Sequence, residues 1–139
     1  IVDYLGNKTI VYWDNKKIEL FAFCIMSNHV HVLFRTYTQA ECGADIQLFD
    51  VIGSIKRHSA AACNKKMGRK GAFWFRESFD RLVRDEGEYQ RILRYILNNP
   101  VKAKLCKHWQ DWPYTYRARA STLSCQRQDK SREEEEKEE

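Results

Sequence analysis

The sequence predicts an α+β sandwich with a mostly antiparallel sheet. Two stretches, residues 45–67 and 88–98, show the spacing of apolar residues that is typical of long helices. Segments rich in β-branched and aromatic residues separate them, as expected of strands. Long helices separated by strands, in a chain of 139 residues that suffices for one domain with its own core, favour this fold class.

Two strands are expected in the first third of the chain. Residues 18–24 and 29–35 are both rich in β-branched and aromatic residues, and the Met-Ser-Asn sequence at 26–28 interrupts them. They therefore form either a hairpin or one long bent strand. Residues 1–17 are ambiguous, because their apolar residues fit one helix face while a glycine and an asparagine among them weaken it. Residues 36–44 have the composition of a loop.

The rest of the chain predicts helix, strand and helix. The glycines after residue 67 end the helix at 45–67, and the aromatic-rich segment 73–83 is predicted to be a strand. Acidic residues at 85–88 suit the start of the next helix, since carboxylates stabilise the positive end of a helix dipole. Pro100 is expected to end that helix, because the residue before a proline is disfavoured in the helical conformation.

Composition sets the domain boundary and excludes several classes. We expect residues 1–116 to form the domain and 117–139 to be a disordered charged tail that ends in a run of glutamates. No apolar run approaches the roughly 18 residues of a membrane-spanning helix. The five cysteines lack a CxxC pair, which argues against a cysteine-based zinc site and favours reduced thiols.

Positive charge is concentrated in one stretch of the chain, whose net charge is +5. Residues 53–76 contain seven basic residues and no acidic one. Such a stretch attracts polyanions such as nucleic acids, although a solubilising surface would look the same. The seven residues are Lys56, Arg57, Lys65, Lys66, Arg69, Lys70 and Arg76.

Two histidines are spaced for metal binding. Side chains alternate between the two faces of a strand, so His29 and His31 point the same way while Val30 points into the other layer. Two such imidazoles can chelate one divalent metal ion. The alternative is a structural or incidental His-Val-His sequence.

A tyrosine and an asparagine share a helix face further along. Tyr95 and Asn99 lie four residues apart, and Ile92, Leu93 and Ile96 are among the residues that supply the core side. Tyr95 is then either a core residue with its hydroxyl at the surface or a nucleophile. A nucleophilic role needs a metal that polarises the phosphate, because a phenol with a pKa near 10 is mostly protonated at neutral pH. Asn99 has an amide oxygen that could complete the coordination of that metal.

Three longer stretches carry a family-level similarity. They are AFCIMSNHVHVLF at 22–34, FWFRESFDRLVRDEGEYQRILRYILNNPVKAKL at 73–105 and DWPYTY at 111–116. Together they closely resemble the REP-associated tyrosine transposases, which belong to the single-tyrosine branch of the HUH nucleases. The similarity spans about residues 18–116, with the NHVH and YILNNPVK elements in the family's order and at its distance.

The resemblance implies a fold and a reaction. It implies a ferredoxin-like α+β sandwich, an antiparallel sheet with its helices packed on one face. Family members begin with a strand rich in Tyr and Arg, and we expect that opening strand to be missing here. The implied reaction is the cleavage and rejoining of single-stranded DNA through a 5′-phosphotyrosine, which is the activity of a DNA transposase.

Roles follow by matching positions to the family's motifs. His29 and His31 match the metal-ligand histidines, Tyr95 the nucleophile and Asn99 the third metal ligand, with Mg²⁺ or Mn²⁺ as the cofactor. The implied partner is single-stranded or hairpin DNA and not a membrane, and the protein would be a monomer or a homodimer. The resemblance also implies a prokaryotic protein of the cytoplasm, associated with the nucleoid.

Contacts to DNA are expected from the basic stretch. Its lysines and arginines would bind phosphates, which position a strand without reading its sequence. Trp74 or Phe75 would stack on an unpaired base, and the alternative for Trp74 is packing in the core. Glu77 and Asp80 lie on opposite faces of the predicted strand, so at most one of them can assist near the metal.

Two other functions remain open on the sequence alone. One is an inactive or domesticated remnant of such a transposase, which binds nucleic acid without cleaving it. The other is a metallohydrolase, in which His29 and His31 hold the metal and water is the nucleophile.

Overall fold

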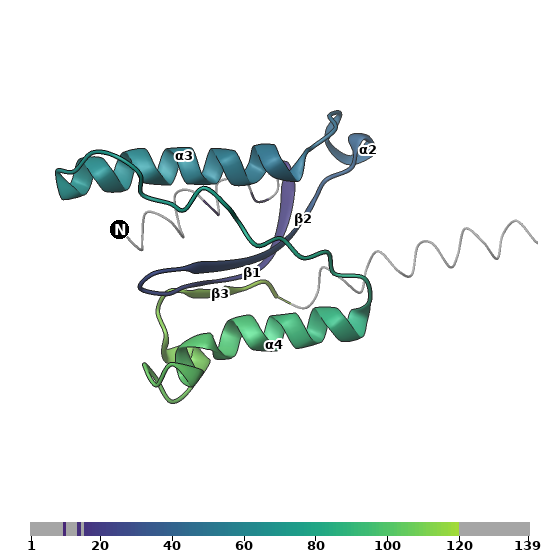
Figure 1. Cartoon of the computed structure of the whole chain (residues 1–139). Coiled ribbons are helices and arrows are strands. Elements are labelled where there is room, and N and C mark those ends of the chain that lie inside the picture. Colours follow the sequence, from purple (N-terminus) through teal and green to yellow (C-terminus); the bar gives the residue numbers. More distant parts are fainter. Residues whose placement is uncertain (1–9, 11–13, 15, 120–139) are drawn as a thin grey trace, which may run out of the picture.

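The computed structural model describes residues 10, 14 and 16–119, which form a sheet between two long helices (Figure 1). The α+β class and the antiparallel sheet are confirmed. The elements in chain order are β1 (Ile18–Ile25), β2 (Val30–Thr36), α2 (Gln39–Cys42), α3 (Leu48–Met67), α4 (Glu86–Lys102), the 3-10 helix η2 (Trp109–Asp111) and β3 (Thr115–Arg117). None of the helices in this described part is long and apolar enough to cross a bilayer.

The sheet has the strand order β2-β1-β3, and both pairings are antiparallel. The first two strands form the hairpin that the sequence allowed, closed by a hydrogen bond from the Met26 N–H to the His29 carbonyl at 2.9 Å. β3 pairs with β1 opposite Phe23 and includes Arg117, so the domain boundary expected at residue 116 falls inside a strand. The expectation that the family's opening strand is missing concerns the start of the chain, and both that region and almost all of the expected tail lie outside the described residues.

A β-bulge in β1 makes that strand apolar on both faces. The register with β2 shifts between Leu20 and Ala22, which changes which alternate residues face which side. Ile18 and Leu20 consequently share a face with Phe23 and not with Ala22. Seven of the eight residues of β1 are buried, as expected for a strand covered on both sides.

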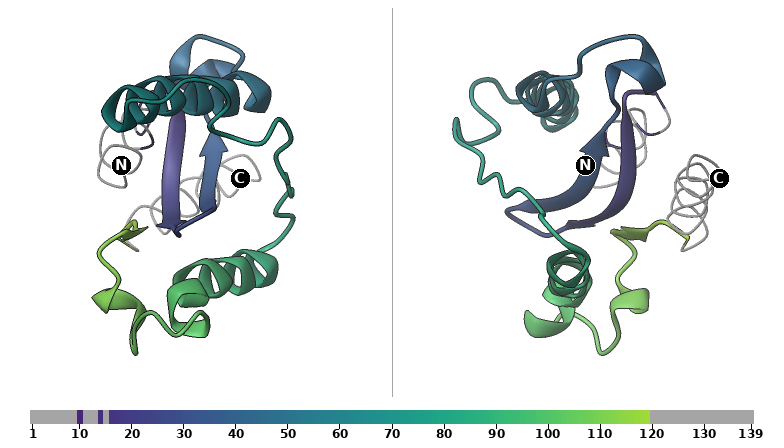
Figure 2. Two further views of the ribbon diagram at one scale, coloured as in Figure 1. Left: turned by 60° about the vertical axis from the view of Figure 1, so that its left-hand side comes forward. Right: turned by 90° about the vertical axis from the view of Figure 1, so that its right-hand side faces the viewer.

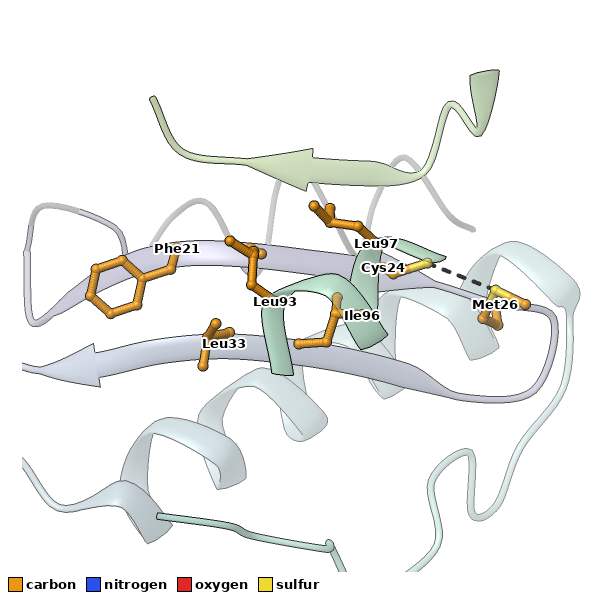
Figure 3. Close-up of a cluster of buried hydrophobic side chains, with 8 residues drawn as sticks. Phe21, Cys24, Met26, Leu33, Leu93, Ile96 and Leu97 are labelled. Carbon is orange, nitrogen blue, oxygen red and sulfur yellow. Dashed lines mark hydrogen bonds between the residues drawn. The ribbon is translucent and has the colours of Figure 1, made fainter. Parts of the chain in front are cut away.

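The two long helices cover opposite faces of the sheet (Figure 1). Val51 and Ile55 of α3 pack on one side, and α4 packs on the other through Leu93, Ile96 and Leu97 (Figure 3). The expectation that the helices share one face is therefore wrong. The physical reason is the apolar run of β1, which needs cover on both faces to be removed from water.

Helix α4 continues beyond the expected end at Pro100 and finishes at Lys102. A proline removes one hydrogen bond and its ring crowds the carbonyl four residues earlier, but it leaves the later hydrogen bonds of the helix intact. The carbonyls of Asn99 and Pro100 still accept hydrogen bonds from Ala103 and Leu105, at 3.0 Å each. The ring of Pro100 is buried, and the helix therefore extends past this residue.

The segment predicted as a strand at 73–83 is irregular instead. The ammonium group of Lys56 on α3 donates to the carbonyls of Phe75 and Glu77, at 3.0 and 3.3 Å. These carbonyls are satisfied by a side chain and not by a neighbouring strand. The segment passes the edge of the sheet at β2 as it connects α3 on one face to α4 on the other (Figure 2).

Candidate active site

The two histidines of the hairpin lie together on the α4 side of the sheet. His31 is the second residue of β2, and His29 lies just before that strand. Val30 packs with the cluster on the opposite face, as the alternation of strand side chains predicts. The two imidazole ring centres are 5.0 Å apart, with the rings nearly perpendicular at 82°.

A neighbouring amide fixes the proton on His29. The Nδ1 atom of His29 lies 2.7 Å from Oδ1 of Asn28. An amide oxygen only accepts hydrogen bonds, so Nδ1 carries the proton and donates it. Nε2 lies on the other side of the ring, and His29 is exposed to solvent.

His31 is held as a neutral imidazole by its surroundings. Asn99 of α4 donates from Nδ2 to Nε2 of His31 at 3.1 Å, which requires an unprotonated Nε2. Burial lowers the pKa of His31 below its usual value of 6.5, and the nearby His29 lowers it further. The lone pair on Nε2 of His31 accepts this hydrogen bond, and Nε2 is the atom through which the neutral imidazole would bind a metal ion.

Tyr95 lies beside this pair of histidines. Its ring centre is 5.4 Å from that of His31, and the two rings are inclined by 77°. The packing of α4 sets this position, because Leu93, Ile96 and Leu97 are buried on the sheet and leave Tyr95 at the edge. The tyrosine is 55% exposed, so its ring is open to a large partner.

A cleft of about 520 Å³ opens between β2, the irregular segment and α4. Its lining includes His31 and Tyr95 together with three side chains that the sequence analysis did not single out: Phe79, Arg81 and Arg91. Phe79 and Arg81 were not identified because residues 73–83 were predicted to be a regular strand, whereas the segment is irregular. The helical spacing of Arg91, four residues before Tyr95, was the signal that could have identified the third.

A buried carboxylate attaches the irregular segment to α4. Glu88 accepts hydrogen bonds from the backbone N–H of Arg84 at 3.0 Å and from Nε of Arg81 at 2.8 Å. These bonds lower the pKa of Glu88, and the bond from the backbone of Arg84 has the larger effect. Asp85 in turn caps the helix by accepting from the Glu88 N–H at 2.8 Å. The wall of the cleft nearest to Arg81 is therefore fixed to the helix that carries Tyr95.

Comparison with known proteins decides the family. The family model described as "Transposase IS200 like" matches residues 3–99, more than half of the chain. The chain belongs to this transposase family. The resemblance to the REP-associated tyrosine transposases found in the sequence is confirmed.

Two proteins from Haemophilus influenzae are similar to this chain. One, described as "Putative REP-associated tyrosine transposase", is 26% identical over 123 residues, which cover 83% of this chain and 69% of the relative. The other, described as an uncharacterized protein, is 30% identical over 118 residues, covering 70% of this chain and 65% of the relative. The chain thus spans about two thirds of the length of each. No solved structure matches it.

The basic residues of the transposase are spread over α3 and the loop after it. Arg57, Lys65, Lys66, Arg69, Lys70 and Arg76 are exposed. Lys56 is engaged by the carbonyls of Phe75 and Glu77. Helix α3 covers the face of the sheet opposite to Tyr95, but both long helices end on the side of the hairpin (Figure 1). The basic end of α3 and the histidine pair therefore share one end of the domain.

Trp74 is placed in the core and not in the cleft. It packs partly buried against the α3-side cluster, and its indole N–H donates to Oγ of the buried Ser59 at 2.9 Å. The structure thus favours the packing interpretation of this residue over base stacking. Glu77 and Asp80 are exposed and do not line the cleft, and the strand alternation argued for them does not exist.

The donors near Tyr95 suit a metal ion of intermediate hardness. Among residues 10, 14 and 16–119, no three His, Cys, Asp or Glu side chains gather into a metal-binding group. The set here is two imidazole nitrogens and the amide of Asn99, which includes no carboxylate. Turned about its last side-chain bond, this amide would present its oxygen in place of its nitrogen. Two nitrogens and one oxygen fit Mn²⁺ better than Mg²⁺, which prefers oxygen ligands.

Proposed function

We propose that this transposase cleaves and rejoins single-stranded DNA, with Tyr95 as the nucleophile and with His29, His31 and Asn99 as ligands of a divalent metal. The observation that supports it is the contact between Tyr95 and His31. Their ring centres lie 5.4 Å apart, although α4 and β2 are distant in the chain. Asn99, on the same helix face as Tyr95, bonds the same imidazole.

The proposed step is a displacement at phosphorus. The phenol oxygen of Tyr95 gives up its proton and forms a bond to the phosphate, the bond from phosphorus to the 3′ oxygen breaks, and the departing oxygen takes up one proton in return to become a 3′-OH. A bound metal ion would polarise the phosphoryl oxygen and so offset the weak nucleophilicity of a protonated phenol. Attack by a 3′-OH on the phosphotyrosine reverses these changes and frees Tyr95, so joining needs no nucleotide cofactor.

The hydrogen bonds of the two histidines support a role in binding metal. Nε2 of His31 accepts from Asn99, and its lone pair would be open to a metal ion once that amide turns its oxygen toward the site. Asn28 bonds Nδ1 of His29, the ring nitrogen opposite Nε2, and partners at that second nitrogen orient ligand histidines in metalloproteins. The exposed cations of α3 and its loop would meanwhile bind DNA phosphates at the same end of the domain, and a hairpin-bearing strand is the substrate that we infer from the family resemblance.

The decisive experiment is the capture of the covalent intermediate. The full chain is incubated with Mn²⁺ and a labelled DNA hairpin whose single-stranded flanks have randomised sequence, and the products are separated on a denaturing gel. We expect a protein–DNA adduct that requires the metal and is absent in Tyr95→Phe. Tyr114→Phe is the matched control, because Tyr114 packs against the α3-side cluster, away from the histidines.

The other outcomes identify the alternatives. An adduct that persists in Tyr95→Phe would refute the role of this tyrosine. Binding that depends on salt, with no adduct from the unmodified chain, would indicate a remnant that binds nucleic acid without catalysis. Cleavage that survives Tyr95→Phe but is lost in His31→Ala would indicate a metallohydrolase with water as the nucleophile.

A further inference from the structure

The cleft beside Tyr95 has two cationic side chains on its wall, and only one of them is engaged. Arg81 forms an ion pair with Glu88, at 2.6 Å between Nη2 and Oε1. Arg91 is exposed, and its guanidinium has no hydrogen bond or ion pair with any residue in the part of the chain that the structure describes. It lies one helical turn before Tyr95, on the same side of α4. A free guanidinium is thus held next to the proposed nucleophile.

An aromatic side chain faces the same cleft without cover. Phe79 is fully exposed, at 105% of its reference area, although burial of a phenylalanine is worth about 1.5–3 kcal/mol. It lies in the irregular segment that Glu88 and Lys56 attach to the two long helices. Phe75 of the same segment is almost as exposed, at 89%, but does not line the cleft.

We propose that this cleft binds one nucleotide of the DNA strand adjacent to the phosphate that Tyr95 attacks. Arg91 pairs with a backbone phosphate, and Phe79 stacks on the unpaired base. A guanidinium matches a phosphate through two parallel hydrogen bonds, and a base gains stability by stacking on an exposed ring. The cleft volume of about 520 Å³ falls within the range of pockets that bind small ligands.

This inference rests on the proposed function but is tested by binding alone. The full chain is titrated in EDTA, so that no metal-dependent cleavage occurs, with a short single-stranded oligonucleotide that carries 2-aminopurine. Fluorescence reports both the affinity and the stacking of the modified base. Arg91→Gln is compared with Arg94→Gln, which removes the same charge from a helix position off the cleft. Phe79→Ala is compared with Phe75→Ala.

The expected results separate a contact with DNA from a structural effect. Arg91→Gln weakens binding about tenfold, as the loss of a charge-assisted hydrogen bond predicts, whereas Arg94→Gln changes it less than about twofold. The dependence of log affinity on log salt concentration falls by about 0.7 for Arg91→Gln, the value for one phosphate contact on a single strand. Phe79→Ala abolishes the quenching of 2-aminopurine, Phe79→Tyr restores it, and Phe75→Ala leaves it unchanged.

Equal effects of the two arginine variants, or of the two phenylalanine variants, would overturn the nucleotide subsite. That failure is distinct from failure of the proposed function. If the unmodified chain forms the phosphotyrosine adduct while Arg91→Gln and Arg94→Gln bind DNA alike, the subsite is wrong and the nuclease assignment stands. If no adduct forms but Arg91→Gln and Phe79→Ala weaken binding selectively, the subsite stands without the chemistry.

Discussion

Asn99 on α4 donates a hydrogen bond to Nε2 of His31 on β2 at 3.1 Å, across 68 residues of sequence. This bond connects an exposed edge of the helix to the strand that carries the histidines. This bond and the buried side chains of Leu93 and Ile96 together set the rotation of α4 about its axis. Tyr95, one turn earlier on the same helix face, is held beside His31 as a consequence.

Replacement of Asn99 tests whether this amide belongs to a metal site. We expect Asn99→Ala to weaken Mn²⁺ binding by about tenfold or more, because the site loses its third donor. Asn98→Ala is the control, since Asn98 is the exposed neighbour on the same helix. Calorimetric titration with Mn²⁺ measures both. Equal affinities in the two variants would remove Asn99 from the ligand set.

The buried face of α4 should matter for stability rather than for chemistry. Leu93 is 4% exposed and lies between α4 and the sheet (Figure 3). We expect Leu93→Ala to lower the free energy of unfolding by about 2–5 kcal/mol through lost burial and a residual cavity. Leu82→Ala, at a position that is 79% exposed, should change it by less than about 0.5 kcal/mol. Urea unfolding compares them, and similar losses would contradict this assignment of the core.

The site was easier to predict from the sequence than the layers around it. Alternation along a strand places His29 and His31 on one side, and the four-residue step places Tyr95 with Asn99, because both rules depend only on local backbone geometry. That the two pairs meet is a tertiary fact, which the family resemblance supplied. The position of the helices on opposite faces depends on the bulge between Leu20 and Ala22, for which the sequence carries no clear signal.

In the segment at 73–83, a tertiary contact overrides the local preference for a strand. Its aromatic residues favour a strand, yet the carbonyls of Phe75 and Glu77 are taken by Lys56. Helix α4 also continues past Pro100, against the prediction, for a related reason. The rule that a proline ends a helix neglects the burial of its ring, here fully inside the domain.

Trp74 and Ser59 form a partly buried hydrogen-bonded pair whose energy can be measured. We expect Trp74→Phe to lower the free energy of unfolding by about 1–3 kcal/mol, because Oγ of Ser59 loses a donor and the ring becomes smaller. A double-mutant cycle with Ser59→Ala isolates the hydrogen bond, and a coupling of about 1 kcal/mol is expected. A variant that lost DNA affinity while keeping its stability would restore the stacking role of Trp74.

The hydrogen bonds of Glu88, which join the irregular segment to α4, should weaken at low pH. Because hydrogen bonds from Arg84 and Arg81 lower its pKa in the folded protein, the carboxylate contributes stability above its unfolded value of 4.5. That contribution is lost as the pH falls below 4.5 and through the lowered folded pKa. Glu88→Gln should therefore have a lower melting temperature than the unmodified chain at neutral pH, and the gap should close on acidification. Glu77→Gln, at an exposed position, should show no gap at either pH. A gap for Glu88→Gln that stayed constant from neutral to acidic pH would show that the charge of this carboxylate does not hold the segment to α4.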